Sequence, residues 1–336
     1  MYESYYGFTE RPFQLTPNAQ WFYASRLHKR ALAYLQYGLS QGEGFIVITG
    51  DVGTGKTTIA NQLLSQLNQD EIVAKQIVTS KLGPDDLIRM IASSFNLMVT
   101  EHNKASYLDA IHIFLKRLHS QHRRALLLVD EAQNLPLESI EELRMLSNYQ
   151  INGKPLLQSF LLGQNELNPI IQAPNMEQFR QRIIASSNLT PLVEEETREY
   201  IEYRLRMAGL KSPLLSPDCY ALIQQFSRGI PRKINLLMDR LLLLGYLEQH
   251  KQLTAEHVSN VVSEISEEIA HQQPINQAVN SATAIAEPHV QLESDPMQTH
   301  VQHLLDESLE QKLKLLKELD ELILQRQKST NIPNSE

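Results

Sequence analysis

The sequence is poor in cysteine and lacks long apolar runs. Cys219 is the one cysteine among 336 residues, so an internal disulfide and a cysteine metal cluster are both excluded. No run reaches the roughly 18 apolar residues typical of a membrane helix, and residues 236–247, the most apolar stretch, contain Asp239 and Arg240. The amino terminus lacks the basic start and apolar core of a signal peptide. These absences favour a soluble protein of a reducing compartment.

Positive charge is also scarce. The chain has 31 basic and 39 acidic side chains, a formal net charge of −8. Residues 267–336 hold 12 of the acidic and 5 of the basic side chains, so the first 266 residues are close to neutral. They lack the basic footprint of a nucleic-acid-binding protein. A hydrophobic content of 42% over this length predicts a globular protein with a sizeable core.

A glycine-rich segment is the strongest local signal. Residues 50–57, GDVGTGKT, fit the phosphate-binding pattern G-x-x-x-x-G-K-[ST], with an apolar strand predicted before it and a helix after it. In such a loop the backbone N–H groups converge on phosphate, Lys56 contacts the β- and γ-phosphates, and the Thr57 hydroxyl holds Mg²⁺. The predicted nucleotide-binding residues are Gly50, Asp51, Val52, Gly53, Thr54, Gly55, Lys56, Thr57 and Thr58.

Strands and helices alternate up to residue 191 and then give way to helices. Further strands are predicted at 72–78, 123–129 and 156–162, and helices at 85–95, 106–119 and 140–146. This alternation is typical of an α/β domain with a parallel sheet. Beyond Pro191 we expect no strands and four helices, at 194–207, 217–226, 231–247 and 254–264.

Polar side chains follow the predicted strands. Asp130 and Glu131 come after the apolar run LLLV, where an Asp binds Mg²⁺ and a Glu polarises the attacking water. Gln164 ends the next strand and is either a contact to the γ-phosphate or attacking water, or an ordinary loop amide. Arg182, expected past the last core strand, and Arg232, in the helical domain, are candidate phosphate ligands; the alternative is that they are solvated surface arginines.

The two ends of the chain leave alternatives open. Residues 1–40 carry an aromatic cluster that forms either the wall of an adenine pocket or a small core attaching the amino terminus. The polar composition of residues 267–300 predicts a disordered linker. In residues 301–327, leucines at heptad spacing predict a short coiled coil or partner-binding helix, or an amphipathic helix docked on its own domain.

Taken in order, the motifs GDVGTGKT, LLLVDEAQ, LLGQNEL, FRQRI and GIPRKIN resemble the AAA+ ATPases of the general secretion pathway protein A type. The resemblance covers residues 1 to about 266. The stretches MYESYYGFTERPFQLTPNAQWFY and YLQYGLSQGEGFIVITG are similar to the subgroup encoded with exosortase (PEP-CTERM) exopolysaccharide loci. The resemblance implies that Gln164 is sensor 1, Arg182 the arginine finger and Arg232 sensor 2.

The resemblance also implies an architecture. It predicts an α/β fold, with a P-loop AAA+ parallel-sheet core and a small carboxyl-terminal helical lid. The linker and the short amphipathic helix that follow are predicted from composition and heptad spacing instead. The expected parts are an aromatic segment and helix (1–40), the ATPase core (41–191), the lid (192–266), the linker (267–300) and the amphipathic helix (301–327).

The resemblance predicts a function as well. We expect ATP and Mg²⁺ as ligands, and ATP hydrolysis by a homo-oligomeric ring whose partner is the export or assembly machinery of a cell-envelope polysaccharide or protein. The expected location is cytoplasmic, without a membrane span, and any contact with the inner membrane would be made through a partner.

Two other functions remain compatible with the motifs. A DNA-binding AAA+ ATPase of the transposition or regulator type shares them, although the near-neutral core argues against it. A nucleotide-dependent scaffold that hydrolyses slowly and acts through its tail is the third hypothesis.

Overall fold

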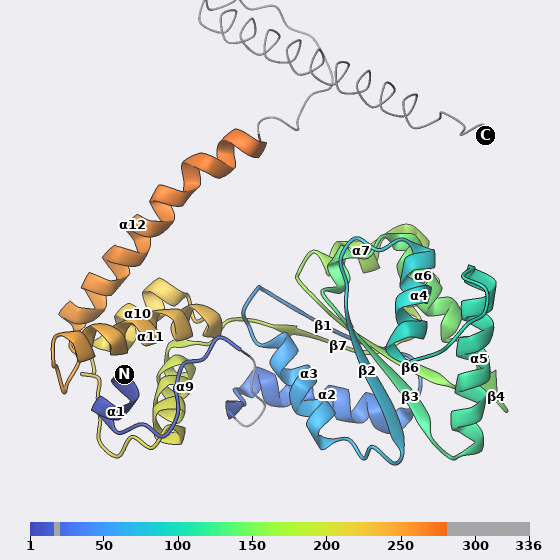
Figure 1. Ribbon diagram of the computed structural model, residues 1–336, viewed down its shortest axis with the longest axis horizontal. Helices are drawn as coiled ribbons and strands as arrows, with labels where there is room; N and C mark the ends of the chain where they lie inside the picture. Colours follow the sequence, from blue (N-terminus) through green and yellow to red (C-terminus); the bar gives the residue numbers. More distant parts are fainter. Residues whose placement is uncertain (17–20, 281–336) are drawn as a thin grey trace, which may run out of the picture. The chain divides into compact units, whose positions relative to one another are not determined.

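The computed structural model describes residues 1–16 and 21–280 (Figure 1). The predicted helix at 301–327 and the predicted linker beyond residue 280 lie outside the described residues. The chain divides into two units, Met1–His271 and Gln272–Glu336. Apart from the last residues of one helix, the description below concerns the first unit.

This unit contains a five-stranded parallel sheet, in the order β2-β3-β6-β1-β7. The strands are β1 (Phe45–Gly50), β2 (Ile72–Val78), β3 (Arg124–Asp130), β6 (Leu157–Gly163) and β7 (Ile183–Leu189). The strands predicted at 72–78, 123–129 and 156–162 are thus confirmed to within one residue. β7 was missed, because its sequence, IIASSNL, is polar in its second half and belongs to a partly exposed edge strand.

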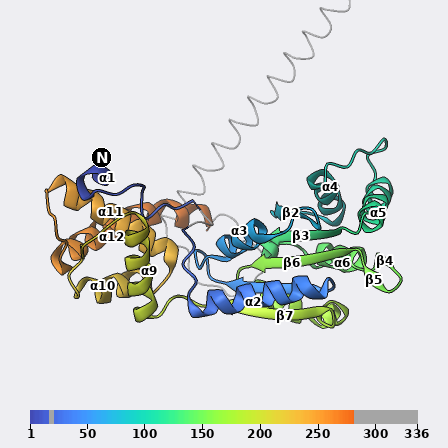
Figure 2. The same ribbon diagram turned by 90° about the horizontal axis from the view of Figure 1, so that it is seen from below.

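Side chains of β1 alternate between the two faces of the sheet, as strand geometry requires. Phe45 and Val47 pack into the core under one set of helices, whereas Ile46 and Ile48 pack into the core under the other. The first set comprises α4 (Pro84–Ser94), α5 (Lys104–Ser120), α6 (Leu137–Leu146), α7 (Leu167–Gln172) and α8 (Glu177–Arg180). The second comprises α2 (Arg26–Gln41) and α3 (Lys56–Gln66) (Figure 2).

Four helices follow the sheet and form a separate hydrophobic core. They are α9 (Glu194–Met207), α10 (Cys219–Ser227), α11 (Pro231–Leu247) and α12 (Ala255–Asn280). All four were predicted, and among the described residues beyond 191 the only β pairing is an isolated bridge between Leu215 and Leu253. We refer to these helices as the lid.

The predicted start of the linker at residue 267 is wrong, because α12 continues to Asn280. The residues that follow Glu264, ISEEIAHQQ, include Glu, Ala and Gln, which favour helix, although their polarity suggested disorder. Glu268 also forms a bidentate ion pair with Arg240 of α11, at 2.9 and 2.7 Å. This pair holds the middle of α12 against α11.

The amino-terminal segment is divided between the two cores. Helix α1 (Tyr2–Tyr6) and the chain after it bury aromatic side chains in the lid core, whereas α2 packs on the sheet. The buried aromatic residues of the segment are Tyr2, Phe8, Phe13 and Trp21. Residues at the two ends of the first unit therefore share one core.

The remaining described elements are short. They are the 3₁₀ turns η2 (Ala132–Asn134) and η3 (Pro174–Met176) and the hairpin of β4 (Gln150–Ile151) and β5 (Lys154–Pro155). None of the helices described is both long enough and apolar enough to cross a membrane.

Candidate active site

The predicted phosphate loop joins the end of β1 to the start of α3. Gly53 and Gly55 have φ angles of +84° and +99°, a region that side chains other than glycine adopt at a cost. Space forbids a side chain too, since a Cβ on Gly53 would lie 2.6 Å from Cβ of Arg232, and one on Gly55 would lie 2.9 Å from Nε2 of His28. The glycines therefore serve both the turn and the close approach of two other elements.

Lys56 begins α3 and turns back into the loop. Its Nζ donates hydrogen bonds to the carbonyl oxygens of Gly50 (2.8 Å) and Asp51 (3.0 Å), and the side chain is buried. Burial lowers the pKa of Lys56, and the nearby carboxylates of Glu131 and Asp130 act in the opposite direction. The lysine thus places one positive charge among acidic groups at the loop that the sequence assigns to phosphate.

Thr57 and Asp130 meet at the carboxyl end of β3. The Thr57 hydroxyl donates to Oδ2 of Asp130 at 2.8 Å, and the Glu131 N–H donates to Oδ1 at 2.9 Å. Gln76 of β2 also reaches Oδ2, at 3.3 Å. Asp130 is 3% exposed, and among the residues that the structure describes it forms no ion pair. A buried, unpaired carboxylate is costly unless a cation joins it.

Glu131 lies directly after β3 in a left-handed conformation, with φ of +56°. Its Oε2 accepts hydrogen bonds from the side-chain amides of Gln133 (2.6 Å) and Gln164 (3.1 Å). Burial acts to raise the pKa of Glu131, but the two amides and the charge of Lys56 outweigh it, so the pKa is lowered. A non-glycine residue with positive φ is strained, and such strain concentrates at functional sites.

Two residues at this site were not among the sequence candidates. Gln133 connects Glu131 to the end of β6, because its Oε1 accepts from the Gln164 N–H at 2.8 Å. The buried Thr79 hydroxyl lies 2.9 Å from the carbonyl of Asp130 and 2.8 Å from that of Glu131. Gln133 stands within the LLLVDEAQ motif, which was a usable signal, whereas nothing in the sequence around Thr79 distinguishes it.

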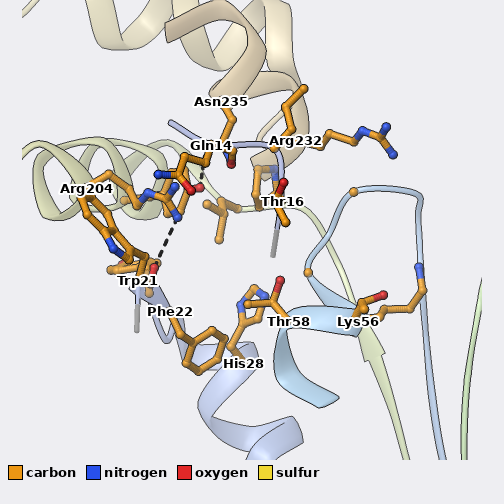
Figure 3. A pocket seen from close by; sticks show the side chains of 18 of the residues that line it. Gln14, Thr16, Trp21, Phe22, His28, Lys56, Thr58, Arg204, Arg232 and Asn235 are labelled. Atoms are coloured by element: carbon orange, nitrogen blue, oxygen red, sulfur yellow. Dashed lines mark hydrogen bonds between the residues drawn. The ribbon is translucent and has the colours of Figure 1, made fainter. Parts of the chain in front are cut away.

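The lid contacts the phosphate loop through the start of α11. The Arg232 N–H donates to the Gly53 carbonyl at 3.3 Å, and the Arg232 stem packs on Gly53. Figure 3 shows the Arg232 side chain leaving α11 on the side of the phosphate loop. The structure therefore brings Arg232 and Lys56 to the lining of one cavity.

Arg182 lies at the opposite edge of the sheet. Its carbonyl accepts from the N–H of Phe45, where β1 begins, whereas the phosphate loop starts where β1 ends. Its guanidinium donates to Ser147 Oγ (2.5 Å) and Asn148 Oδ1. The expectation that Arg182 follows the last core strand is wrong, because β7 comes directly after it. The structure does not bring Arg182 to the site of its own chain.

A cavity of about 290 Å³ lies between the phosphate loop, the amino-terminal segment and the lid (Figure 3). Trp21, Phe22 and Tyr23 line it, whereas Tyr2, Phe8 and Phe13 do not. Tyr2, Phe8 and Phe13 thus lie in the lid core, whereas Trp21 belongs to that core and also lines the cavity. The adenine-pocket alternative stays a prediction for the residues that line the cavity. Arg204 of α9 holds the amino-terminal part of the cavity wall in place. Its guanidinium donates hydrogen bonds to the carbonyl oxygens of Trp21 at 3.4 Å and Pro12 at 2.6 Å.

Comparison with known sequences agrees with this arrangement. Residues 39–171 match the family described as AAA domain. The chain is 37% identical over 267 residues to the General secretion pathway protein A of Aeromonas hydrophila. The alignment covers 79% of this chain and 49% of the relative, so the chain spans about half the length of that curated relative.

Solved structures share the fold. The ORC2 protein of Aeropyrum pernix, in ADPNP–ADP complexes, has a TM-score of 0.58 at 16% identity, over 76% of this chain and 72% of that one. The ORC1 protein of the same organism, in complex with DNA, has a TM-score of 0.58 at 19% identity, over 77% and 70%. At these identities the likeness shows the fold alone, which matches the predicted P-loop core with its parallel sheet. On this sequence relationship and this fold, residues 39–171 form an AAA domain, and the chain is similar to the general secretion pathway protein A type over most of its length.

Proposed function

We propose that this protein hydrolyses Mg²⁺-bound ATP at the carboxyl edge of its sheet and uses the cycle to support assembly or export of a cell-envelope polysaccharide or protein. The triphosphate would lie on the phosphate loop, with Lys56 on its β- and γ-phosphates. The base and ribose would enter the cavity beside Trp21 and Phe22. Arg232, from the lid, would contact the triphosphate on its other side.

The contact between Thr57 and Asp130 is the observation that carries this proposal. A hydroxyl and a carboxylate from two separate motifs lie 2.8 Å apart. Both are oxygen ligands of the kind Mg²⁺ prefers, and the carboxylate is 3% exposed and forms no salt bridge with any described residue. Thr57 and Asp130 therefore fit the metal, which when bound would neutralise charge on the phosphate oxygens.

Glu131 is placed to act on water. Its lowered pKa favours the carboxylate form, and it directly follows Asp130, the proposed metal ligand, in the chain. An ionised carboxylate in this position would orient and polarise the water that attacks the γ-phosphate. Gln164 would align Glu131 through the hydrogen bond between their side chains. Arg182 would serve the site of a neighbouring subunit in a homo-oligomeric ring.

The secretion role rests on the relative. A protein named General secretion pathway protein A shares 37% identity with this chain over 267 residues. We extend that role to the export or assembly of an envelope polymer, at the cytoplasmic side of the membrane, because of the exopolysaccharide-locus resemblance of residues 1–50. The likeness to the DNA-bound ORC1 structure is one of fold only, and the near-neutral core argues against the DNA-binding alternative.

Two substitutions test the ATPase chemistry. Lys56→Ala should lose both ATP binding and hydrolysis, because it removes the positive charge at the β- and γ-phosphates. Glu131→Gln should bind ATP normally and lose about 10²–10⁴-fold in turnover, the usual contribution of a general base. Calorimetric ATP binding and steady-state phosphate release, each with and without Mg²⁺, measure both effects. The matched control is Glu10→Gln, at an exposed carboxylate. Wild-type turnover in Glu131→Gln would overturn the assignment of the base.

A genetic test addresses the cellular role. A strain lacking the gene should lose an exported envelope polymer or protein, and wild-type protein should restore it whereas Glu131→Gln should not. Surface polysaccharide and exported protein are measured in parallel. An unchanged envelope, together with ATP turnover that DNA stimulates with a steep salt dependence, would favour the DNA-binding alternative instead.

A further inference from the structure

His28 is a buried histidine that the assignments above do not use. It lies in the first turn of α2 and is 5% exposed. Its ring bridges two elements, with Nδ1 2.7 Å from the Ser25 hydroxyl and Nε2 2.9 Å from the carbonyl oxygen of Thr54 in the phosphate loop. Figure 3 shows the ring lying beside the start of α3, between Phe22 and Thr58.

The hydrogen-bond partners determine which nitrogen carries the proton. The Thr54 carbonyl is an acceptor only, so Nε2 must be protonated and donate to it. The Ser25 hydroxyl then donates to Nδ1, while its oxygen accepts from the His28 backbone N–H at 3.4 Å. Burial lowers the pKa of His28, so the neutral ring with Nε2–H is the form that fits this site.

The hydrogen bond from His28 to the Thr54 carbonyl also affects the N–H group of the same peptide unit, which belongs to Gly55. In a trans peptide the C=O and N–H groups point in opposite directions. A carbonyl held toward His28 therefore directs the Gly55 N–H away from His28. Gly55 has φ of +99°, and glycine allows the peptide before it to rotate at little cost. Without a partner for the carbonyl, this N–H would be free to turn away.

We propose that His28 is a positioning residue that holds the Thr54–Gly55 peptide in the orientation in which the Gly55 N–H binds phosphate. This inference rests on the proposed function of the site as an ATP site. His28 would not touch the nucleotide phosphates itself. Its contribution is to keep one donor of the loop aligned before the ligand arrives, which reduces the ordering cost of binding.

The segment that contains His28 is also attached to the lid. The backbone N–H of Arg26, two residues before His28, donates to Glu196 of α9 at 3.1 Å. The Tyr23 hydroxyl donates to Glu199 of α9 at 2.6 Å, and the Tyr23 ring packs on Tyr200. The chain on one side of His28 is thus attached to the lid, and its imidazole is attached to the loop. The orientation of the Gly55 N–H would follow the position of α9.

Substitutions that place an amide nitrogen at the position of only one of the two ring nitrogens of His28 test the proposal. The amide nitrogen of glutamine can take the place of Nε2, whereas that of asparagine can take only the place of Nδ1. We expect His28→Phe and His28→Asn to lower ATP and ADP affinity about tenfold, and His28→Gln to stay within about twofold of wild type. Adenosine affinity should be unchanged in all three variants. Calorimetry with ATP, ADP and adenosine provides these affinities.

Two controls make the result specific. His112→Phe replaces a histidine that stacks on Tyr149 of another element, and it should alter none of the affinities. Thermal unfolding without nucleotide shows whether each variant is folded, and if His28→Phe is not, the comparison of His28→Gln with His28→Asn carries the same test. Equal losses in these two variants, or an equal loss for adenosine and ADP, would overturn the proposal and make His28 a packing residue.

The outcome separates this inference from the proposed function. One outcome would refute only the proposed role of His28. In that outcome wild-type protein binds ATP, Lys56→Ala does not, and His28→Asn binds ATP as well as wild type does. If wild-type protein and Lys56→Ala both fail to bind ATP, the proposed function fails first.

Discussion

The two edges of the parallel sheet carry opposite kinds of group. At the carboxyl edge the chain forms the phosphate loop and the start of α3, where free backbone N–H groups favour an anion. At the amino edge Arg182 lies at the end of α6 and donates to the Arg144 carbonyl at 3.4 Å, where a helix end favours a cation. One strand, β1, connects the two edges. The same sheet can therefore present an anion site at the carboxyl ends of its strands and an arginine at their amino ends.

The largest expected effect concerns the amino edge. If Arg182 completes the site of the next subunit, Arg182→Ala should keep ATP binding and lose about 10³-fold or more in turnover. Mixing it with Glu131→Gln should restore part of the activity, because some interfaces then combine an intact base with an intact arginine. The ATPase rate against mixing ratio measures this, at a concentration where the protein assembles.

Arg180→Ala is the matched control for that experiment. Arg180 lies two residues away, and its guanidinium donates to the carbonyls of Ile171 (2.9 Å) and Ala173 (2.7 Å) in its own chain. It should show no complementation with Glu131→Gln. A mixture of Arg182→Ala and Glu131→Gln no more active than the mean of its parents would place the role of Arg182 within its own chain.

Two glycines with positive φ differ in what surrounds them. Gly53 at the carboxyl edge and Gly153 in the β4–β5 hairpin both have positive φ, +84° and +77°. A Cβ on Gly53 would meet Arg232, whereas a Cβ on Gly153 would meet nothing within 4 Å. Both substitutions by alanine should cost about 1–3 kcal/mol of backbone strain. Gly53→Ala alone should also weaken ATP binding, by about tenfold, because it separates the lid from the loop.

Denaturant unfolding and ATP titration of the two alanine variants measure these effects. Equal ATP affinity in both would mean that the contact between Gly53 and Arg232 does not matter for the nucleotide. If the two variants lose different amounts of stability, Gly53→Ala should lose more, because the steric contact with Arg232 adds to its backbone strain.

The smallest expected effect is a pH dependence at the carboxyl edge. Burial lowers the pKa of His28 in the folded state, so below the unfolded value of about 6.5 the unfolded chain binds more protons there than the folded one. The free energy of unfolding should therefore decrease as the pH falls below about 6.5, because protonation of His28 favours the unfolded chain. The free energy of unfolding should decrease less between pH 7 and pH 5 in His28→Gln than in wild type. The same pH series on His112→Gln serves as the control, and an identical pH slope in His28→Gln and wild type would contradict the prediction.

Local motifs were predictable because each depends on neighbouring residues. The strand, glycine loop and helix around residues 50–57 are contiguous, so residue type and spacing together predict the turn and its ligand. The apolar strand ending in Asp130 and Glu131 is local in the same sense. β7 and the extension of α12 were not predictable from pattern, because a half-exposed edge strand and a polar helix both resemble loop.

The sequence alone was enough to predict the strand, glycine loop and helix around residues 50–57 and the change from sheet to helices after residue 191. It also predicted the metal ligands and the base, and these assignments stay predictions. Three-dimensional packing was needed to show that the amino-terminal aromatics are shared between the lid core and the cavity. It also decided that Gln133 and His28 hold Glu131 and the phosphate loop, and that Arg182 faces away from its own site. The physical reason is that these roles depend on hydrogen bonds and burial between separate elements, which arise only when the parallel sheet and the lid bring those elements together.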